Sequence, residues 1–125
     1  MDQAVCLDTD VCIEIIRDTP NGRRVIDLVE NKEIFISSIS VFELYLRNFN
    51  LDKIDFFLEK VSILSFDTLA AKKSSEIDKK LKKKGKILEI RDIFIAASCL
   101  SKDLELATFN IKHFEKIDEL ILLKL

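Results

Sequence analysis

Short apolar runs that alternate with longer amphipathic segments constrain this chain's fold most strongly. Apolar runs of this kind suit the central strands of a parallel sheet, whose two faces are both covered by helices. The segments between the runs carry apolar residues at helical spacing, as Val11, Ile15 and Ile16 do. Strands alternating with helices predict an α/β fold, a three-layer α/β/α sandwich around a mostly parallel sheet of four to five strands. The expected strands are 5–7, 34–37, 62–66, 104–108 and 120–123.

Polar residues beside the apolar segments predict where the helices begin. After the first strand, either Thr9 or Asp10 can cap a helix, and after the second either Ser38 or Ser40 can do so. We expect the helix after the second strand to extend as far as Phe49. Another helix is expected to start at Thr19-Pro20. Three more are expected over residues 51–60, 67–85 and 90–101.

Length and composition favour one globular domain over residues 1–125. Hydrophobic residues make up 48% and charged residues 34% of the chain, which is typical of a folded rather than a disordered protein. Two glycines and one proline leave little room for a linker. The net charge of −2 does not mark a nucleic-acid binder, but an acidic site would lower the net charge and leave room for a local basic surface.

Three features predict a cytoplasmic protein that does not cross a membrane. Cys6, Cys12 and Cys99 are odd in number, lie in apolar segments and lack zinc-ligand spacing, so we expect buried, reduced thiols. Residues 1–3 lead straight into the first expected strand, without a signal peptide. No apolar run approaches the roughly 18 residues that can span a bilayer.

Oxygen-bearing side chains stand near the ends of the expected strands. Asp8 follows the first strand, Glu43 lies on the helix after the second, and Asn110 follows the fourth. Asp92 lies near the start of the helix at 90–101. Ligands of open α/β sheets bind at the carboxyl ends of the strands, so we expect these four side chains to meet there.

Such a cluster predicts a site for a hard divalent cation. Carboxylates held close together repel each other and raise a pKa unless a cation offsets their charge. Oxygen ligands favour Mg²⁺ or Mn²⁺, and the single histidine, His113, is expected to pack or support the site rather than bind metal. A bound ion of this kind polarises phosphate and activates water, so the cluster predicts hydrolysis at phosphorus.

Four segments resemble the motifs of the PIN domain family. CLDTDVCI resembles the opening motif, usually written LDTNVLI, and ISSISVFEL resembles the second, with the acid before a leucine. GKILEIRDIFIAA resembles the third motif and LATFNIKHF the fourth. Each motif is weak alone, but all four occur in order between residues 5 and 114. The compact size also resembles the VapC toxins of toxin–antitoxin pairs.

The resemblance implies a metal-dependent endoribonuclease that leaves 5′-phosphate and 3′-hydroxyl ends. Asp8, Glu43 and Asp92 match the three most constant acids of the family, which are its catalytic residues and metal ligands. Thr9 matches a hydroxyl that supports the first acid. Asn110 stands where many members carry a fourth acid, and it can bind metal or orient a water without adding charge.

Three further polar residues are expected to support the site. Asp10 stands where the family usually has Asn or Ser, and it either supplies an extra carboxylate or caps the helix. Ser38 and Thr108 lie within the second and fourth motifs. Arg47 falls near a position that is often glycine, and this departure predicts nothing by itself.

RNA and a VapB-type antitoxin are the partners that the resemblance implies, with an antitoxin arginine entering the acidic site. The apolar residues Phe42, Tyr45, Leu46 and Phe49 exceed what one helix face can bury, which favours a homodimer or antitoxin interface. One lysine run fits RNA binding no better than it fits a solvated helix end, and its members are Lys79, Lys80, Lys82, Lys83, Lys84 and Lys86. The candidate RNA-binding cations are Arg17, Arg23, Arg24, Lys83, Lys84 and Lys86.

Three other functions compete with this interpretation. Asp8-Thr9-Asp10 fits the start of a haloacid-dehalogenase phosphatase, with Asp8 as nucleophile, but a later Asp-Asp pair is lacking. A phospho-receiver domain has the right length, but no lysine matches its pattern well. Asn110 also leaves open a PIN fold used only as a scaffold for RNA or protein.

Overall fold

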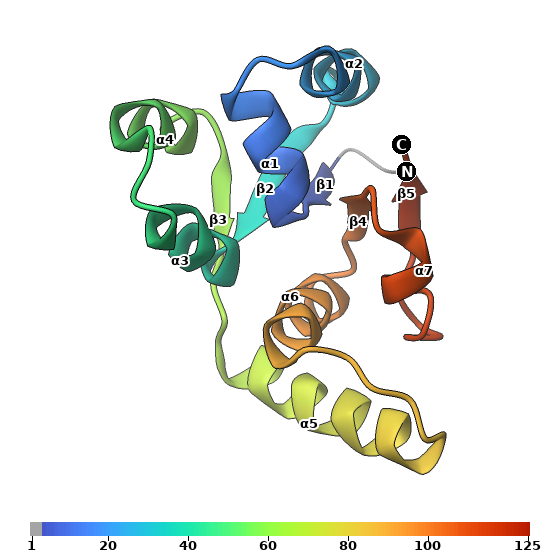
Figure 1. Cartoon of the computed structure of the whole chain (residues 1–125). Coiled ribbons are helices and arrows are strands. Elements are labelled where there is room, and N and C mark those ends of the chain that lie inside the picture. The colour runs from blue at the N-terminus through green and yellow to red at the C-terminus, as the bar shows by residue number, and fades with distance from the viewer. Residues whose placement is uncertain (1–3) are drawn as a thin grey trace.

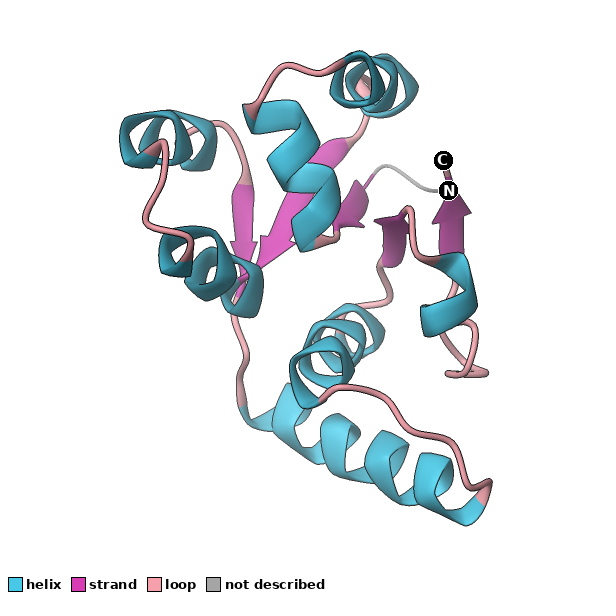
Figure 2. Ribbon diagram, viewed as in Figure 1, coloured by secondary structure: helices cyan, strands magenta, loops and turns pink. Residues whose placement is uncertain are grey.

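The computed structural model describes residues 4–125, which form a sheet of five parallel strands in the order β3-β2-β1-β4-β5 (Figures 1 and 2). This confirms the predicted fold class. The expected absence of a leader at residues 1–3 lies outside the described residues. The strands are β1 Ala4–Leu7, β2 Glu33–Ser37, β3 Ser62–Leu64, β4 Glu105–Thr108 and β5 Leu122–Lys124.

Helices cover both faces of the sheet. Neighbouring side chains of each strand point to opposite faces, so each strand contributes to the buried layer on either side. Val5 and Leu7 of β1 belong to one buried cluster, whereas Cys6 between them belongs to the other. The first cluster includes α1, α2, α3 and α4, and the second includes α5, α6 and α7. The helices are α1 Thr9–Ile16, α2 Pro20–Val29, α3 Ser38–Leu46, α4 Leu51–Leu58, α5 Thr68–Lys83, α6 Ile90–Ser101 and α7 Ile111–Phe114.

The caps of α1 and α3 differ from the predicted ones. Asp8, rather than Thr9 or Asp10, is the N-cap of α1, and Ser37, rather than Ser38 or Ser40, is the N-cap of α3. Both residues have extended backbones, with ψ of 158° and 146°. An N-cap needs this extended conformation, and the residue at the end of a strand already has it.

The helix α3 is shorter than predicted because the chain turns sharply after it. It ends at Leu46, and Asn48 and Asn50 both have left-handed backbones, with φ of 51° and 56°. Asparagine tolerates this conformation better than most residues, and it cannot continue a right-handed helix. Phe49 therefore lies in the connection to α4 instead of on α3. The helix α7 was not predicted, and β3 ends two residues before the expected Phe66.

The central strands place the candidate site at the point where the chain's winding reverses. The chain moves outward from β1 through β2 to β3, and then crosses back to β4 on the other side of β1. The backbone N–H of Asp8 donates to the carbonyl oxygen of Ala107 at 3.0 Å, which holds the ends of β1 and β4 together. Crevices at such reversals are the usual ligand sites of α/β sheets.

The three cysteines are free and fully buried, as expected. Among the helices of residues 4–125, none is long and apolar enough to cross a membrane.

Candidate active site

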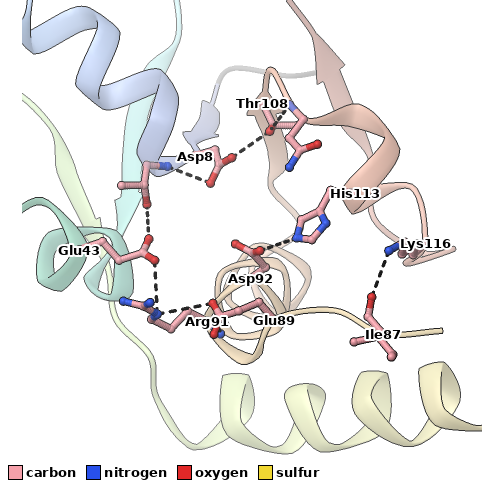
Figure 3. A network of polar contacts seen from close by, with 11 residues as sticks. Asp8, Glu43, Ile87, Glu89, Arg91, Asp92, Thr108, His113 and Lys116 are labelled. Atoms are coloured by element: carbon pink, nitrogen blue, oxygen red, sulfur yellow. Dashed lines mark hydrogen bonds and ion pairs between the residues drawn. The ribbon is translucent and has the colours of Figure 1, made fainter.

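An open cavity of about 460 Å³ lies at the carboxyl end of β1, between the starts of α1 and α6 and the middle of α3. Figure 3 shows the polar side chains that meet around it. The four residues expected at the strand ends all line this cavity, so the predicted convergence is confirmed. The oxygen-bearing side chains of the wall are Asp8, Thr9, Asp10, Glu43, Glu89, Asp92 and Asn110.

Asp8 is the most buried acid of the cavity. Its residue is only 6% exposed, and both carboxylate oxygens accept hydrogen bonds. The backbone N–H of Thr9 donates to Oδ1 at 2.9 Å, and the Thr108 hydroxyl donates to Oδ2 at 2.9 Å. Burial raises the pKa of Asp8 to about 6, and the charges of Asp92 and Asp10 add to this, whereas the two hydrogen bonds oppose it.

Glu43 points from α3 towards the start of α1. Its Oε1 accepts a hydrogen bond from the Thr9 hydroxyl at 2.5 Å, and Ser40 Oγ lies 2.8 Å from the same hydroxyl. Because a hydroxyl carries a single proton, a Thr9 hydroxyl that donates to Glu43 accepts from Ser40. The other oxygen, Oε2, lies 3.6 Å from Nε of Arg91 (Figure 3). Both Glu43 oxygens are thus oriented by groups from other helices.

Asp92 lies in the first turn of α6 and contacts the single histidine of the chain. His113 Nε2 is 2.6 Å from Asp92 Oδ2, and the His113 ring also meets Phe114 edge-on at 5.6 Å. This agrees with the expectation that His113 packs against and supports the site. Arg91 does not pair with its neighbour Asp92, but with Glu43 and Glu89.

Asn110 and Thr108 connect the end of β4 to the cavity. Asn110 is exposed, and its side chain makes no capping hydrogen bond although it stands at the N-cap of α7. Its backbone N–H donates to the Thr108 hydroxyl at 3.0 Å, and that hydroxyl in turn donates to Asp8. Thr108 therefore supports the site as predicted, by fixing the Asp8 carboxylate.

The donor set fits a hard divalent cation, although the side chains as they stand do not surround one. Within residues 4–125, no three acidic, histidine or cysteine side chains are grouped closely enough to hold an ion together. Instead Glu43 turns towards Thr9 and Arg91, and Asp92 turns towards His113. Oxygen donors around a buried acid with a raised pKa are nevertheless the chemistry that Mg²⁺ or Mn²⁺ would satisfy.

Comparison with known proteins agrees with this architecture. A model of the PIN domain matches residues 5–120, which is most of the chain. The chain belongs to the PIN domain family.

This PIN domain also has similar relatives over nearly its whole length. It is 32% identical to the Ribonuclease VapC2 of Rickettsia felis, over 93% of each chain. It is 30% identical to the tRNA(fMet)-specific endonuclease VapC of Salmonella typhimurium, over 89% of each. The crystal structure of VapBC2 from Rickettsia felis bound to a promoter DNA fragment has a chain that superposes with a TM-score of 0.88 at 29% identity, over 98% of both chains. The phosphatase and receiver alternatives are set aside by this family membership.

One expectation about the surroundings of the PIN-domain site does not match the structure. Ser38 does not support the site, because its hydroxyl accepts from the backbone N–H of Phe66 at 3.1 Å and holds the connection between β3 and α5. Ser40, instead of Ser38, forms the hydrogen bond with the Thr9 hydroxyl. Sequence spacing could have indicated this, because Ser40 and Glu43 are three residues apart and share a helix face.

The cations beside the cavity also differ from those that the sequence singled out. Within the described chain, Arg47 and Arg91 line it, and none of the six candidate RNA-binding residues does. Arg23 pairs with Asp18, and Lys84 pairs with Asp118, both away from the cavity. No local pattern marks Arg47 or Arg91, because each reaches the cavity through the packing of its helix. The six cations placed elsewhere are Arg17, Arg23, Arg24, Lys83, Lys84 and Lys86.

Proposed function

We propose that this PIN domain is an endoribonuclease toxin of the VapC type, which hydrolyses RNA phosphodiester bonds with Mg²⁺ or Mn²⁺. The observation that carries the proposal is the meeting of Asp8, Glu43, Asp92 and Asn110 at one cavity where the sheet's winding reverses. The names of the relatives, a Ribonuclease VapC2 and a tRNA(fMet)-specific endonuclease, support the same activity.

Asp8, Glu43, Asp92 and Asn110 would hold the ion in this proposal. When bound, the ion would polarise a phosphate oxygen and lower the pKa of a water molecule. The protein's own part is to aim the ligands. Thr108 and the Thr9 backbone fix Asp8, and the Thr9 hydroxyl fixes Glu43.

Cleavage of mixed cellular RNA by the purified protein tests the proposal. We expect discrete fragments with 5′-phosphate ends in Mg²⁺ or Mn²⁺, and none after EDTA is added. A folded, metal-loaded protein that binds RNA or an antitoxin without cutting would contradict it and favour the scaffold function.

We also propose that His113 positions Asp92 for metal binding. If Nε2 donates to Oδ2, the hydrogen bond leaves Oδ1 of Asp92 available to the ion. Loss of such a supporting partner typically weakens metal affinity about 10–100-fold. We therefore expect His113→Phe, which keeps a ring beside Phe114 but loses the donor, to weaken Mn²⁺ binding about 10-fold by calorimetry. His113→Gln keeps an N–H donor and should lose less, and equal losses in both variants would contradict the role.

The exposed apolar residues of α3 and of the loop after it form the proposed interface with a second copy or an antitoxin. Phe42, Leu46 and Phe49 are each more than half exposed, and Tyr45 is 37% exposed. Solved relatives are complexes named VapBC, which supports an antitoxin partner. We expect a homodimer by light scattering of the isolated protein, and a monomer at micromolar concentration would count against self-association.

A further inference from the structure

Arg91 and Arg47 are cations in a cavity wall that is otherwise rich in acids. A phosphate of RNA is repelled by unneutralised carboxylates, so a nuclease of this kind gains from a local cation beside the acids. Arg91 directly precedes Asp92 on α6, and Arg47 is the C-cap of α3, so the two arginines come from different helices. The six cations singled out by the sequence lie elsewhere, so they do not fill this role inside the cavity.

The Arg91 side chain lies among charged and aromatic neighbours but donates no hydrogen bond to them within the described chain. Its Nε lies 3.6 Å from Glu43 Oε2 and 3.5 Å from Glu89 Oε1 (Figure 3), both longer than the usual range for a charge-assisted hydrogen bond. Its guanidinium also lies 5.8 Å from the centroid of the Phe42 ring. Within residues 4–125, the Arg91 side chain donates no hydrogen bond shown by the structure, so its N–H groups remain available to a ligand.

The contact of Arg91 with Glu89 is weak enough for a phosphate to replace it. The Arg91 side chain is 39% exposed and that of Glu89 is 48% exposed, and solvent-exposed ion pairs contribute little to stability. A guanidinium, by contrast, presents a planar fork of donors that matches two oxygens of a phosphate. Arg91 is therefore prepared to exchange a loose carboxylate contact for a bidentate phosphate contact.

The aromatic ring beside Arg91 favours single-stranded RNA over a duplex. Phe42 is 54% exposed in the isolated chain, and an exposed ring next to a cation is the combination on which unpaired bases stack. This role requires that a homodimer forms through Tyr45, Leu46 and Phe49 and leaves the Phe42 ring uncovered. A-form duplexes present their bases much less accessibly to such a ring. The guanidinium of Arg91 lies 5.8 Å from the centre of this ring, and Arg91 also lines the cavity, so one ligand can contact both.

We propose that Arg91, with Arg47 beside the same cavity, binds a backbone phosphate of single-stranded RNA next to the bond that is cut. This proposal rests on the proposed ribonuclease function and deepens it by naming a substrate-binding residue. It assigns phosphate binding to the wall of the acidic cavity instead of to the lysine-rich end of α5.

RNA affinity measured at several salt concentrations tests the proposal without requiring cleavage. The probe is a fluorescent single-stranded poly(U) oligonucleotide, bound in Mg²⁺ by protein carrying Asp8→Asn to prevent cutting. We expect Arg91→Gln to weaken binding about 10-fold. It should also reduce the slope of log affinity against log salt by about 0.7, the value for one lost phosphate contact on a single strand.

Two further variants separate phosphate recognition from general effects. Arg91→Lys keeps the charge but loses the fork, so it should keep the salt slope and lose part of the affinity. Lys72→Gln, which changes an exposed cation of α5 outside the cavity, is the matched control and should bind within about two-fold of the parent protein. Thermal unfolding of each variant shows whether it is folded.

The outcomes distinguish this proposal from the ribonuclease proposal. Unchanged affinity and slope in Arg91→Gln would overturn the phosphate role, even if the wild-type protein cleaves RNA. The same is true if Lys72→Gln weakens binding and lowers the slope as much as Arg91→Gln does. A reduced slope in Arg91→Gln together with a wild type that does not cleave would support the phosphate role and overturn the ribonuclease.

Discussion

Glu43→Gln and Asp92→Asn should each lower the rate of RNA cleavage by about 10²–10⁴-fold while leaving the protein folded. Each substitution removes one negative charge from the cavity but keeps the shape of the side chain. In Glu43→Gln the amide oxygen still accepts from the Thr9 hydroxyl, and in Asp92→Asn it still reaches His113. The expected loss therefore falls on metal binding rather than on packing.

The measurement compares cleavage rates at saturating Mg²⁺ with the affinity for Mn²⁺ and the thermal midpoint of each variant. Asp27→Asn, an exposed acid on α2 outside the cavity, is the matched control and should cleave at the wild-type rate. Full activity in either cavity variant would remove that acid from the catalytic set. Equal losses in Asp27→Asn would attribute the effect to overall charge.

Asp8→Asn should make the metal-free protein more stable at neutral pH although it removes an acid of the proposed catalytic site. The pKa of Asp8 is raised from 3.8 to about 6 in the folded state, mainly by burial. The folded protein thus binds this proton more tightly than the unfolded chain does. The protonated Asp8 carboxyl therefore stabilises the folded state fully below about pH 4, and this stabilisation is lost as the pH rises through about 6.

The size of this effect follows from the shift of about two pKa units, at 1.36 kcal/mol each. Asparagine avoids the cost of a buried charge, but it accepts the hydrogen bonds of Thr9 and Thr108 less well. We therefore expect the free energy of unfolding in EDTA to be higher in Asp8→Asn by about 1–3 kcal/mol at pH 8.

Urea unfolding in EDTA at pH 4, 6 and 8 provides the check. The advantage of Asp8→Asn should shrink towards zero or reverse at pH 4, where the wild-type carboxyl is protonated. Added Mg²⁺ should stabilise the wild type more than the variant, since only the wild type keeps the complete ligand set. A difference that does not change with pH, or a variant less stable at pH 8, would contradict the raised pKa of Asp8.

Local sequence was sufficient for the order of the strands and of the longer helices, and for the position of the acids. Asp8 and Asn110 could be predicted because each follows an apolar strand, and the ends of parallel strands share one edge of the sheet. Asp92 and Glu43 could be predicted from their places on helices that start at that edge. The strands, the helices and the positions of the acids on them depend on the spacing of residues that are close together in the chain, and the sequence shows this spacing directly.

The partners of each acid were decided by the tertiary structure. Ser38 and Ser40 are two positions apart, roughly 200° around a helix, so only one of them can face Thr9. The rotation of α3 makes that choice, and the burial of Leu44 against the sheet sets the rotation. Sequence spacing indicates Ser40 only once Glu43 is placed at the site, because spacing shows which residues share a helix face but not which way that face is turned.

The same reason explains why Arg91 and His113 were not assigned their contacts from the sequence. Arg91 meets Glu43, which is 48 positions away in the chain, and His113 meets Asp92 from a short helix that was not predicted. The sequence by itself determined which residues arrive at the carboxyl edge of the sheet. The packing of α3, α6 and α7 decided which side chains face each other there, because contacts between distant segments depend on the orientation of whole elements.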